Sequence, residues 1–216
     1  MQNESKISVQ IPVTLFPAWL SLYAPRLQIL DISAMDHSEW TSATNYWDIP
    51  SLHTLKLTNC PLPWHSLDLS KVTTLVLFCV PASFRQNLVE FLATLGRMQA
   101  LTVLYLGNAL RYILSSGTFS VSPEVALPCL ARLSVVASPS TVIALLSCIS
   151  IPVETQVRLK ILVDATSVDD FAELSLVLAQ RFNQGFTLAL PDNPFVGHPF
   201  LSACFIGIRC LYIRAH

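Results

Sequence analysis

The chain has few charged residues, few glycines and no excess of basic residues. Charged residues make up 12% of the 216 positions, roughly half of the usual share. Lys and Arg number 13 against 14 Asp and Glu. This balance argues against general electrostatic binding to nucleic acid, which requires a basic surface. Because 52% of the residues are hydrophobic, the sequence predicts a large core beneath a thin polar surface.

The common motifs of catalysis and cofactor binding are also missing. The 6 glycines stand alone, so the sequence has neither a phosphate-binding loop nor a dinucleotide fingerprint. It has no G-x-S-x-G nucleophile elbow, and no cysteine or histidine pair with metal-ligand spacing. We therefore expect no catalytic residue, no cofactor and no metal site.

The sequence also contains two clusters of titratable residues outside these motifs. His53 and His65, with Asp68 nearby, are interpreted as solvent-facing residues rather than a metal or catalytic site. The acidic run from Asp169 to Glu173 falls in an expected first helical turn, where carboxylates complement the helix dipole.

One long uncharged run raises the question of a membrane span. Leu133 to Val153 carries no charge and is long enough to cross a bilayer. Pro139 and Pro152 interrupt it, however, and several serines dilute it. The run is better explained as a strand, a Ser-Pro-Ser turn and a short amphipathic helix. We expect no membrane partner.

The N-terminus and the cysteines favour an intracellular protein, cytoplasmic or nuclear. The first residues lack the basic-then-apolar order of a signal peptide. The 6 cysteines show no paired framework, and they are expected to be buried, reduced thiols. They are Cys60, Cys79, Cys129, Cys148, Cys204 and Cys210.

A recurring pattern, L-x-x-L-x-L, is the main signal in the sequence. Its last two apolar positions are two residues apart, so in a strand they point to the same side. The period matches the roughly 20–29 residues of leucine-rich repeats. Prolines precede it at positions 25, 50 and 128 and fix the chain as it enters the strand. The segments are Leu27–Ile32, Leu52–Leu57, Val72–Leu77, Leu101–Leu106, Leu130–Val135 and, with a degenerate first position, Gln156–Ile161.

The residues between these segments predict helices and turns. Ser83 and Ser140 are expected to open helices, and Ser167 a third. The stretch 59–71, rich in Pro and Trp, is too short and broken for a helix. Asn59 and Asn108 follow two of the strands and are expected to hydrogen-bond the backbone of the turn that leaves the strand.

Strand–helix alternation at this period predicts the fold. We expect an α/β leucine-rich-repeat solenoid, a horseshoe like ribonuclease inhibitor, with a parallel sheet on its concave face. Residues 1–24 are expected to be a lead-in or cap. Residues 25–190 form the expected repeat domain, and residues 191–216 an irregular C-terminal tail.

Several phrases resemble a known family. They are the segments Ala24–Leu27, Ile49–Leu57, Leu62–Trp64 and Val72–Leu77. These segments resemble the F-box-like leucine-rich-repeat proteins abundant in mushroom-forming fungi. The likeness runs from about residue 11 to residue 183. The resemblance implies a substrate-recognition subunit of a cullin-based ubiquitin ligase. The family's F-box opens with a Leu-Pro-x-Glu type phrase, and residues 1–24 contain none. A ligase adaptor is therefore an expected partner only if an F-box lies upstream.

The strand register predicts which side chains face a partner. Residues that flank the inward positions would line the concave face, with an aromatic centre and a basic end. Aromatic residues and Arg are favoured as binding anchors. The residues expected to contact a protein partner are Lys56, Phe78, Tyr105, Arg132, Arg158 and Lys160.

Three hypotheses for function follow from these patterns. The first is a protein–protein interaction module similar to the substrate-binding part of an F-box ligase subunit. The second is a structural or degenerate repeat fragment with no link to a ligase, which the missing F-box phrase favours. The third, a hydrolase on a parallel α/β sheet, is disfavoured because no nucleophile motif is present.

Overall fold

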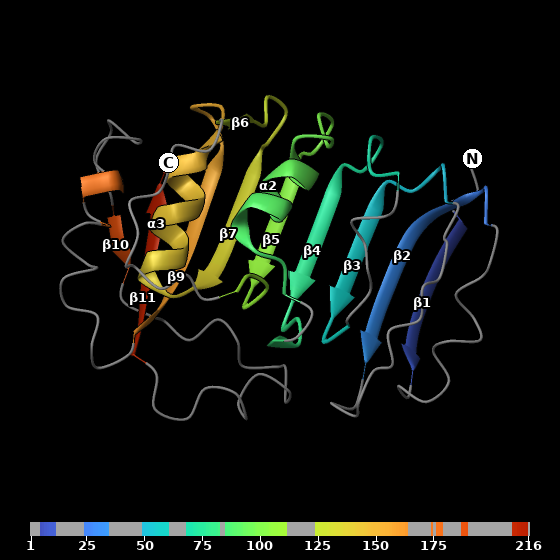
Figure 1. The fold of residues 1–216 in the computed structure, drawn as a ribbon, viewed down its shortest axis with the longest axis horizontal. Helices are drawn as coiled ribbons and strands as arrows, with labels where there is room; N and C mark the ends of the chain where they lie inside the picture. Colours follow the sequence, from blue (N-terminus) through green and yellow to red (C-terminus); the bar gives the residue numbers. More distant parts are fainter. Residues whose placement is uncertain are drawn as a thin grey trace.

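The computed structural model shows an α/β fold built on a sheet with seven parallel strands (Figure 1). It describes residues 5–11, 24–34, 49–60, 68–82, 85–111, 124–163, 174, 176–178, 187–189 and 209–215. The parallel strands are β1 (Ser5–Ile11), β2 (Leu27–Ala34), β3 (Thr54–Thr58), β4 (Thr74–Phe78), β5 (Val103–Gly107), β7 (Arg132–Ala137) and β9 (Gln156–Val163). Along this part of the sheet each strand lies beside the next one in the chain. The predicted α/β class and parallel sheet are confirmed.

Inward leucines stand in register across the sheet. Leu30, Leu55, Leu75, Leu104 and Leu133 are successive backbone partners on adjacent parallel strands. A second row, two residues further along, runs from Ile32 through Leu57, Leu77 and Leu106 to Val135. No residue of either row is more than 4% exposed. Each such leucine contributes about 1.5–3 kcal/mol of transfer free energy, so the two rows are a main source of the fold's stability.

The same turn precedes six of the strands. In each, a backbone N–H donates to the carbonyl oxygen three residues earlier, over 3.0 to 3.2 Å. Proline follows the first residue of this turn at Pro25, Pro50 and Pro128, where its fixed φ suits the turn. The prediction that these prolines fix the entry to the strand is confirmed. The pairs, donor first, are Leu27 and Ala24, Leu52 and Ile49, Val72 and Leu69, Leu101 and Met98, Leu130 and Leu127, and Thr155 and Pro152.

A residue in the left-handed backbone region follows each of three neighbouring strands. Asn59, Cys79 and Asn108 have φ values of 52°, 51° and 52°. Each donates its backbone N–H to a carbonyl of the next strand, over 2.7 to 2.9 Å. The Asn59 side chain also donates to the carbonyl of Ala34, 3.3 Å away on the preceding strand. It therefore ties two strands together, whereas the sequence predicted a bond to its own turn.

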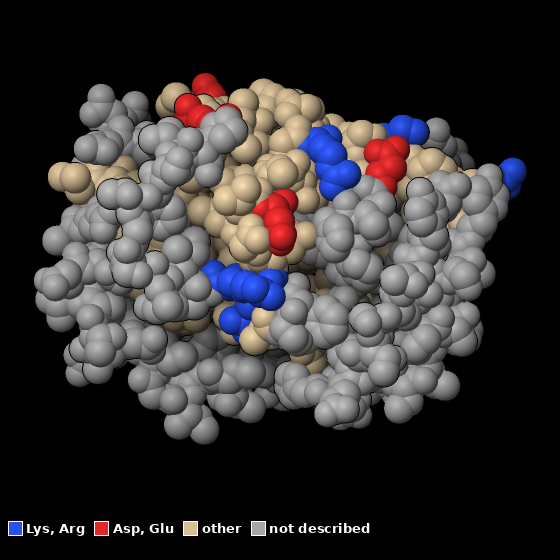
Figure 2. All heavy atoms as spheres, in the orientation of Figure 1, with Lys and Arg blue, Asp and Glu red and all other residues tan. Residues whose placement is uncertain are grey.

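Two helices cover one side of the sheet (Figure 1), and the described part of this side carries few charged side chains (Figure 2). Helix α2 (Leu88–Leu95) buries Leu88, Phe91, Leu92 and Leu95 against the sheet. Helix α3 (Pro139–Cys148) is buried at nearly every position, so the prediction of an amphipathic helix there is wrong. A two-stranded sheet of β6 (Val125–Ala126) and β8 (Ile149–Ser150) accompanies them.

The predicted helix starts are wrong by a few residues. The side chain of Asn87 caps α2 by accepting from the backbone N–H of Glu90, whereas Ser83 was expected to do so and lies outside the described residues. Ser138 caps α3 in place of the expected Ser140. Pro139 follows it in the first helical turn, where the missing N–H is harmless. The helix expected after Ser167 falls largely outside the described residues, but Leu174 and Leu178 are buried in the core.

The sequence placed the last parallel strand out of register by two residues. It aligned Leu159 with Leu133, but the partner of Leu133 is Val157, and Leu159 pairs with Val135. Val157, Leu159 and Ile161 are all buried. Side chains alternate with a period of two in a strand, so a slip of two residues preserves the buried face and leaves the pattern ambiguous. Buried Thr155 ends the preceding turn, where earlier strands have a leucine or valine.

Both chain ends contribute strands that the sequence did not predict. Strand β1 lies within the expected lead-in and pairs with β2, so that Ile7 stands beside Leu30. Strand β11 (Arg209–Ala215) lies within the tail predicted to be irregular, and that prediction is wrong for these residues. It pairs antiparallel with β9, and β10 (Thr187–Ala189) pairs antiparallel with β11 at the edge of the sheet.

The uncharged run from Leu133 to Val153 divides as the sequence predicted, into a strand, a turn and a helix. Within the residues that the structure describes, no helix is both long and apolar enough to cross a membrane.

Candidate functional site

The side of the sheet opposite α2 and α3 carries the residues expected to bind a partner. We call it the open face. Its side chains alternate along each strand with the buried ones. They form three rows: Lys6, Ile29, Thr54, Thr74, Val103, Arg132 and Gln156; Ser8, Asp31, Lys56, Val76, Tyr105, Ser134 and Arg158; and Ser33, Thr58, Phe78, Gly107, Val136 and Lys160.

Two predicted aromatic residues come together on neighbouring strands. The ring centroids of Phe78 and Tyr105 are 6.0 Å apart, with the ring planes tilted by 37°. This lies within the range of favourable aromatic pairs. Both side chains are half-buried, so the pair offers a preformed apolar surface in the middle of the open face.

Gly107 makes room for this aromatic pair. It is the backbone partner of Phe78 on the next strand. A Cβ atom added to Gly107 would lie 2.2 Å from Cδ2 of Phe78 and 2.5 Å from Cε2. The Phe78 ring therefore lies across the bare backbone of Gly107. The sequence analysis missed this arrangement, although a glycine within a strand often marks a close approach of this kind.

Three of the predicted cationic residues gather on β7 and β9, the last two parallel strands of the sheet, and we call this region the cationic end. Arg132 on β7 and Arg158 on the adjacent strand β9 are both exposed. Lys160 follows Arg158 by two residues on the same strand, so it shares that face. The fourth, Lys56, lies on β3, four strands away from Arg158, and its backbone partner is Asp31. Five of the six predicted residues therefore lie on the consecutive strands β4, β5, β7 and β9, and Lys56 lies on the neighbouring strand β3, beside Val76 of β4.

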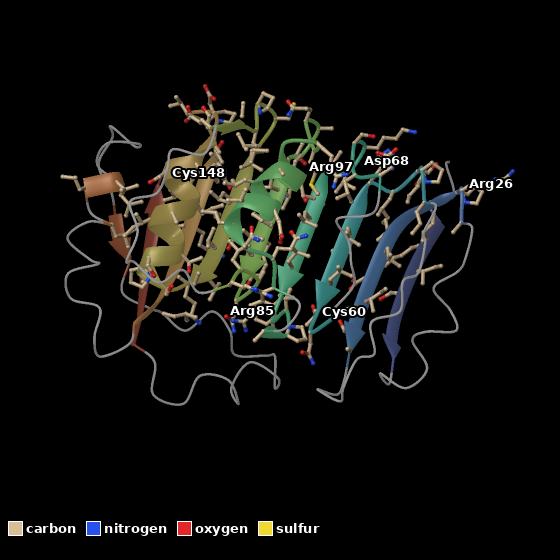
Figure 3. The ribbon with its side chains drawn as sticks, viewed as in Figure 1. Arg26, Cys60, Asp68, Arg85, Arg97 and Cys148 are labelled. Atoms are coloured by element: carbon tan, nitrogen blue, oxygen red, sulfur yellow. The ribbon has the colours of Figure 1, made fainter. Side chains whose placement is uncertain are left out.

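The histidine and carboxylate clusters do not form a site within the described residues. His53 is exposed, and its Nδ1 lies 2.6 Å from the carbonyl oxygen of Ser51. His65 and the run from Asp169 to Glu173 lie outside the described residues. Hydrogen bonds from Ser70, supported by the charges of Lys71 and Arg97, lower the pKa of the Asp68 carboxyl. Figure 3 shows Asp68 and Arg97 at the edge of the sheet where the strands begin.

A small cavity lies at the opposite edge, where strands β5 and β7 end. Its volume is about 180 Å³, and Arg85, Asn108, Ser138 and Thr141 supply its polar lining. The half-buried Arg85 donates from Nε to the carbonyl of Val80 over 2.8 Å, and burial lowers the pKa of its guanidinium. Figure 3 shows Arg85 at this edge. The sequence did not predict the cavity, because its lining comes from separate segments of the chain.

The cysteines are only partly as predicted. Among the described residues, Cys60, Cys79, Cys129 and Cys148 form no disulfide. Cys60 and Cys148 are buried, but Cys129 is exposed and Cys79 is half-buried. The expectation that all the thiols are buried is therefore wrong for these two.

Neither the protein-family models, nor the curated proteins, nor the solved structures contain a match to this chain. The open face is thus characterised by its own geometry: an aromatic pair beside an exposed cationic end, on a sheet whose other side is buried.

Proposed function

We propose that the chain is a leucine-rich-repeat solenoid and that its open face binds a protein partner. The observation that carries this proposal is the order of the sheet. Seven parallel strands follow one another in chain order, and their inward apolar residues form two continuous rows. Repeat proteins of this kind bury one side of each unit against its neighbours and use the remaining surface for binding.

The side chains on the open face support binding rather than catalysis. Phe78 and Tyr105 present rigid aromatic surface, and Arg132 and Arg158 present exposed guanidinium groups. Tyr and Arg dominate the binding energy of many protein interfaces. By analogy with the family that the sequence resembles, the bound partner is the substrate of a cullin-based ubiquitin ligase.

A link to the ligase needs a separate test. In the resembled family an N-terminal helical segment binds the ligase adaptor, whereas residues 5–11 of this chain form strand β1 of the sheet. Residues 5–11 are therefore not that segment, and the ligase role remains to be distinguished from the second hypothesis, a structural or degenerate repeat fragment with no link to a ligase. Titration of the purified chain with the ligase adaptor distinguishes the two. A stable complex supports the ligase role, whereas the absence of a complex supports the second hypothesis.

The binding role is tested by a double substitution on the open face. Tyr105→Ala with Arg132→Ala removes one aromatic anchor and one cation, and we expect about tenfold weaker capture of the protein partner. The matched control, Val89→Ala with Arg97→Ala, changes exposed residues at α2 and after its end and should leave capture unchanged. Circular dichroism checks that both variants fold. Equal capture by both variants contradicts the proposal.

A further inference from the structure

The charges on the open face are unevenly distributed. The three rows contain the cations Lys6, Lys56, Arg132, Arg158 and Lys160 but the single carboxylate Asp31. Asp31 stands beside Lys56, five strands away from Arg158. The end formed by β7 and β9 therefore carries cations without a carboxylate in the described rows, although the whole chain has a formal net charge of -1.

An apolar strip lies directly beside this cationic end. Val76 and Phe78 on β4 and Val103 and Tyr105 on β5 occupy neighbouring positions of the three rows, and the buried Val136 on β7 continues the third row. Because Gly107 leaves its space to the Phe78 ring, this strip is continuous across two strands. The open face thus has an apolar strip on β4 and β5 beside cations on β7 and β9, and a partner must match both.

We infer that the partner presents an extended acidic peptide segment that lies across the strands from β4 to β9. This inference rests on the proposed binding function and specifies the chemistry of the partner. An aromatic or aliphatic side chain of the segment packs on Phe78 and Tyr105. Carboxylates of the same segment pair with Arg132 and Arg158, whose planar guanidinium groups bind carboxylates through two parallel hydrogen bonds.

The strand spacing sets the distance between the two parts of the segment. Tyr105 and Arg158 share a row and are two strands apart, which corresponds to roughly 10 Å. An extended chain advances about 3.3 Å per residue. The acidic residues should therefore lie about three residues from the apolar anchor.

A nucleic acid fits this surface less well than an acidic peptide. Nucleic-acid binding depends on many cations along a continuous track, whereas the cationic end consists of Arg132, Arg158 and Lys160. Three cations beside an aromatic pair suit a short acidic segment.

Selection of peptides tests this inference. Displayed random peptides of about ten residues, long enough to span the strip and the cationic end, are selected on the full chain. They are also selected on the charge-reversed variant Arg132→Glu with Arg158→Glu. We expect peptides from the unaltered chain to be enriched in Asp and Glu about three residues from Trp, Phe or Leu. Their affinity for the variant should fall by about tenfold or more.

Controls distinguish a failure of the acidic-peptide inference from a failure of the proposed binding function. Lys71→Glu with Arg97→Glu makes the same change in net charge at exposed positions away from the open face, and it should not alter peptide affinity. If the selected peptides need Tyr105 but are not acidic, the inference fails and the binding function stands. If they bind independently of Tyr105, Arg132 and Arg158, both fail. The inference is overturned if no peptide is selected, or if a single-stranded oligonucleotide binds the chain more tightly than the selected peptides do.

Discussion

At the scale of single residues, Gly107 and Phe78 depend on each other. The Phe78 ring occupies the space where a side chain of residue 107 would lie, and the ring also contacts Tyr105. Gly107→Ala must therefore displace the ring and disturb the aromatic pair at the centre of the open face.

We expect Gly107→Ala to lower the free energy of unfolding by about 1–3 kcal/mol, the usual cost of overpacking. The same substitution in a Phe78→Ala background should cost much less, because the obstructing ring is gone. Urea unfolding of the four proteins in this double-mutant cycle gives the coupling. An equal cost in both backgrounds would show that the ring does not lie over Gly107.

Cys79 occupies a left-handed backbone conformation that suits it poorly. Its φ of 51° matches those of Asn59 and Asn108 at the ends of the neighbouring strands. Asparagine tolerates this region better than other side chains with a Cβ atom. In the sequence, this position is recognisable as a turn only where it holds asparagine. The pattern therefore does not identify Cys79 as the equivalent of Asn59 and Asn108.

Cys79→Asn should raise the free energy of unfolding by about 0.5–1 kcal/mol, because it relieves part of this strain. Cys129→Asn, at an exposed position without a positive φ, serves as the control and should change stability by less than about 0.5 kcal/mol. Thermal and urea unfolding measure both. A loss of stability in Cys79→Asn alone would mean that the thiol's contacts outweigh the strain.

At the scale of the elements, the spacing of leucines predicted the central strands well. The pattern L-x-x-L-x-L combines a turn and two inward positions, so it identifies both the strand and its buried face. It failed for β1, where Ile7 is the backbone partner of Leu30 but is 38% exposed, and where Glu4 takes the place of the first leucine. It also failed for β11, because antiparallel pairing with β9 lies outside the recurring pattern.

Helix boundaries were harder to predict than strands. Ser83, Asn87, Ser138 and Ser140 are all residue types that can cap a helix. The choice depends on the backbone: Asn87 and Ser138 have extended ψ values of 160° and 157°, which aim their side chains at the first helical N–H groups. Local composition does not determine that conformation, since the preceding strand fixes where the chain enters the helix.

The shared core makes a prediction about one central strand. Leu104→Ala removes a fully buried side chain between Leu75 and Leu133 and should cost about 2–5 kcal/mol. Val103→Ala changes the adjacent residue, which faces the open side and is only half-buried, so it should cost less than about 1 kcal/mol. Chemical denaturation compares the two. A cost below about 0.5 kcal/mol for Leu104→Ala would place that side chain outside the core.

At the scale of the whole molecule, the sequence predicted which residues face outward and that they group into an aromatic centre and a basic end. A period of two assigns Phe78, Tyr105, Arg132, Arg158 and Lys160 to one face, and the slip of two residues in β9 does not alter that face. The contact across Gly107 and the separation of Lys56 from the other cations depend on strand order and packing. Neither is encoded in any single segment.

The order of the strands is the claim on which the proposed binding face depends, and spin-label distances test it most directly. Lys6 and Gln156 share the first row and are six strands apart, and Thr54 and Gln156 are four strands apart. With native cysteines replaced and labels placed at these pairs, we expect backbone separations of about 29 Å and about 19 Å. The longer distance for the Lys6 pair would support sequential parallel strands. Equal distances, or a shorter distance for that pair, would contradict them.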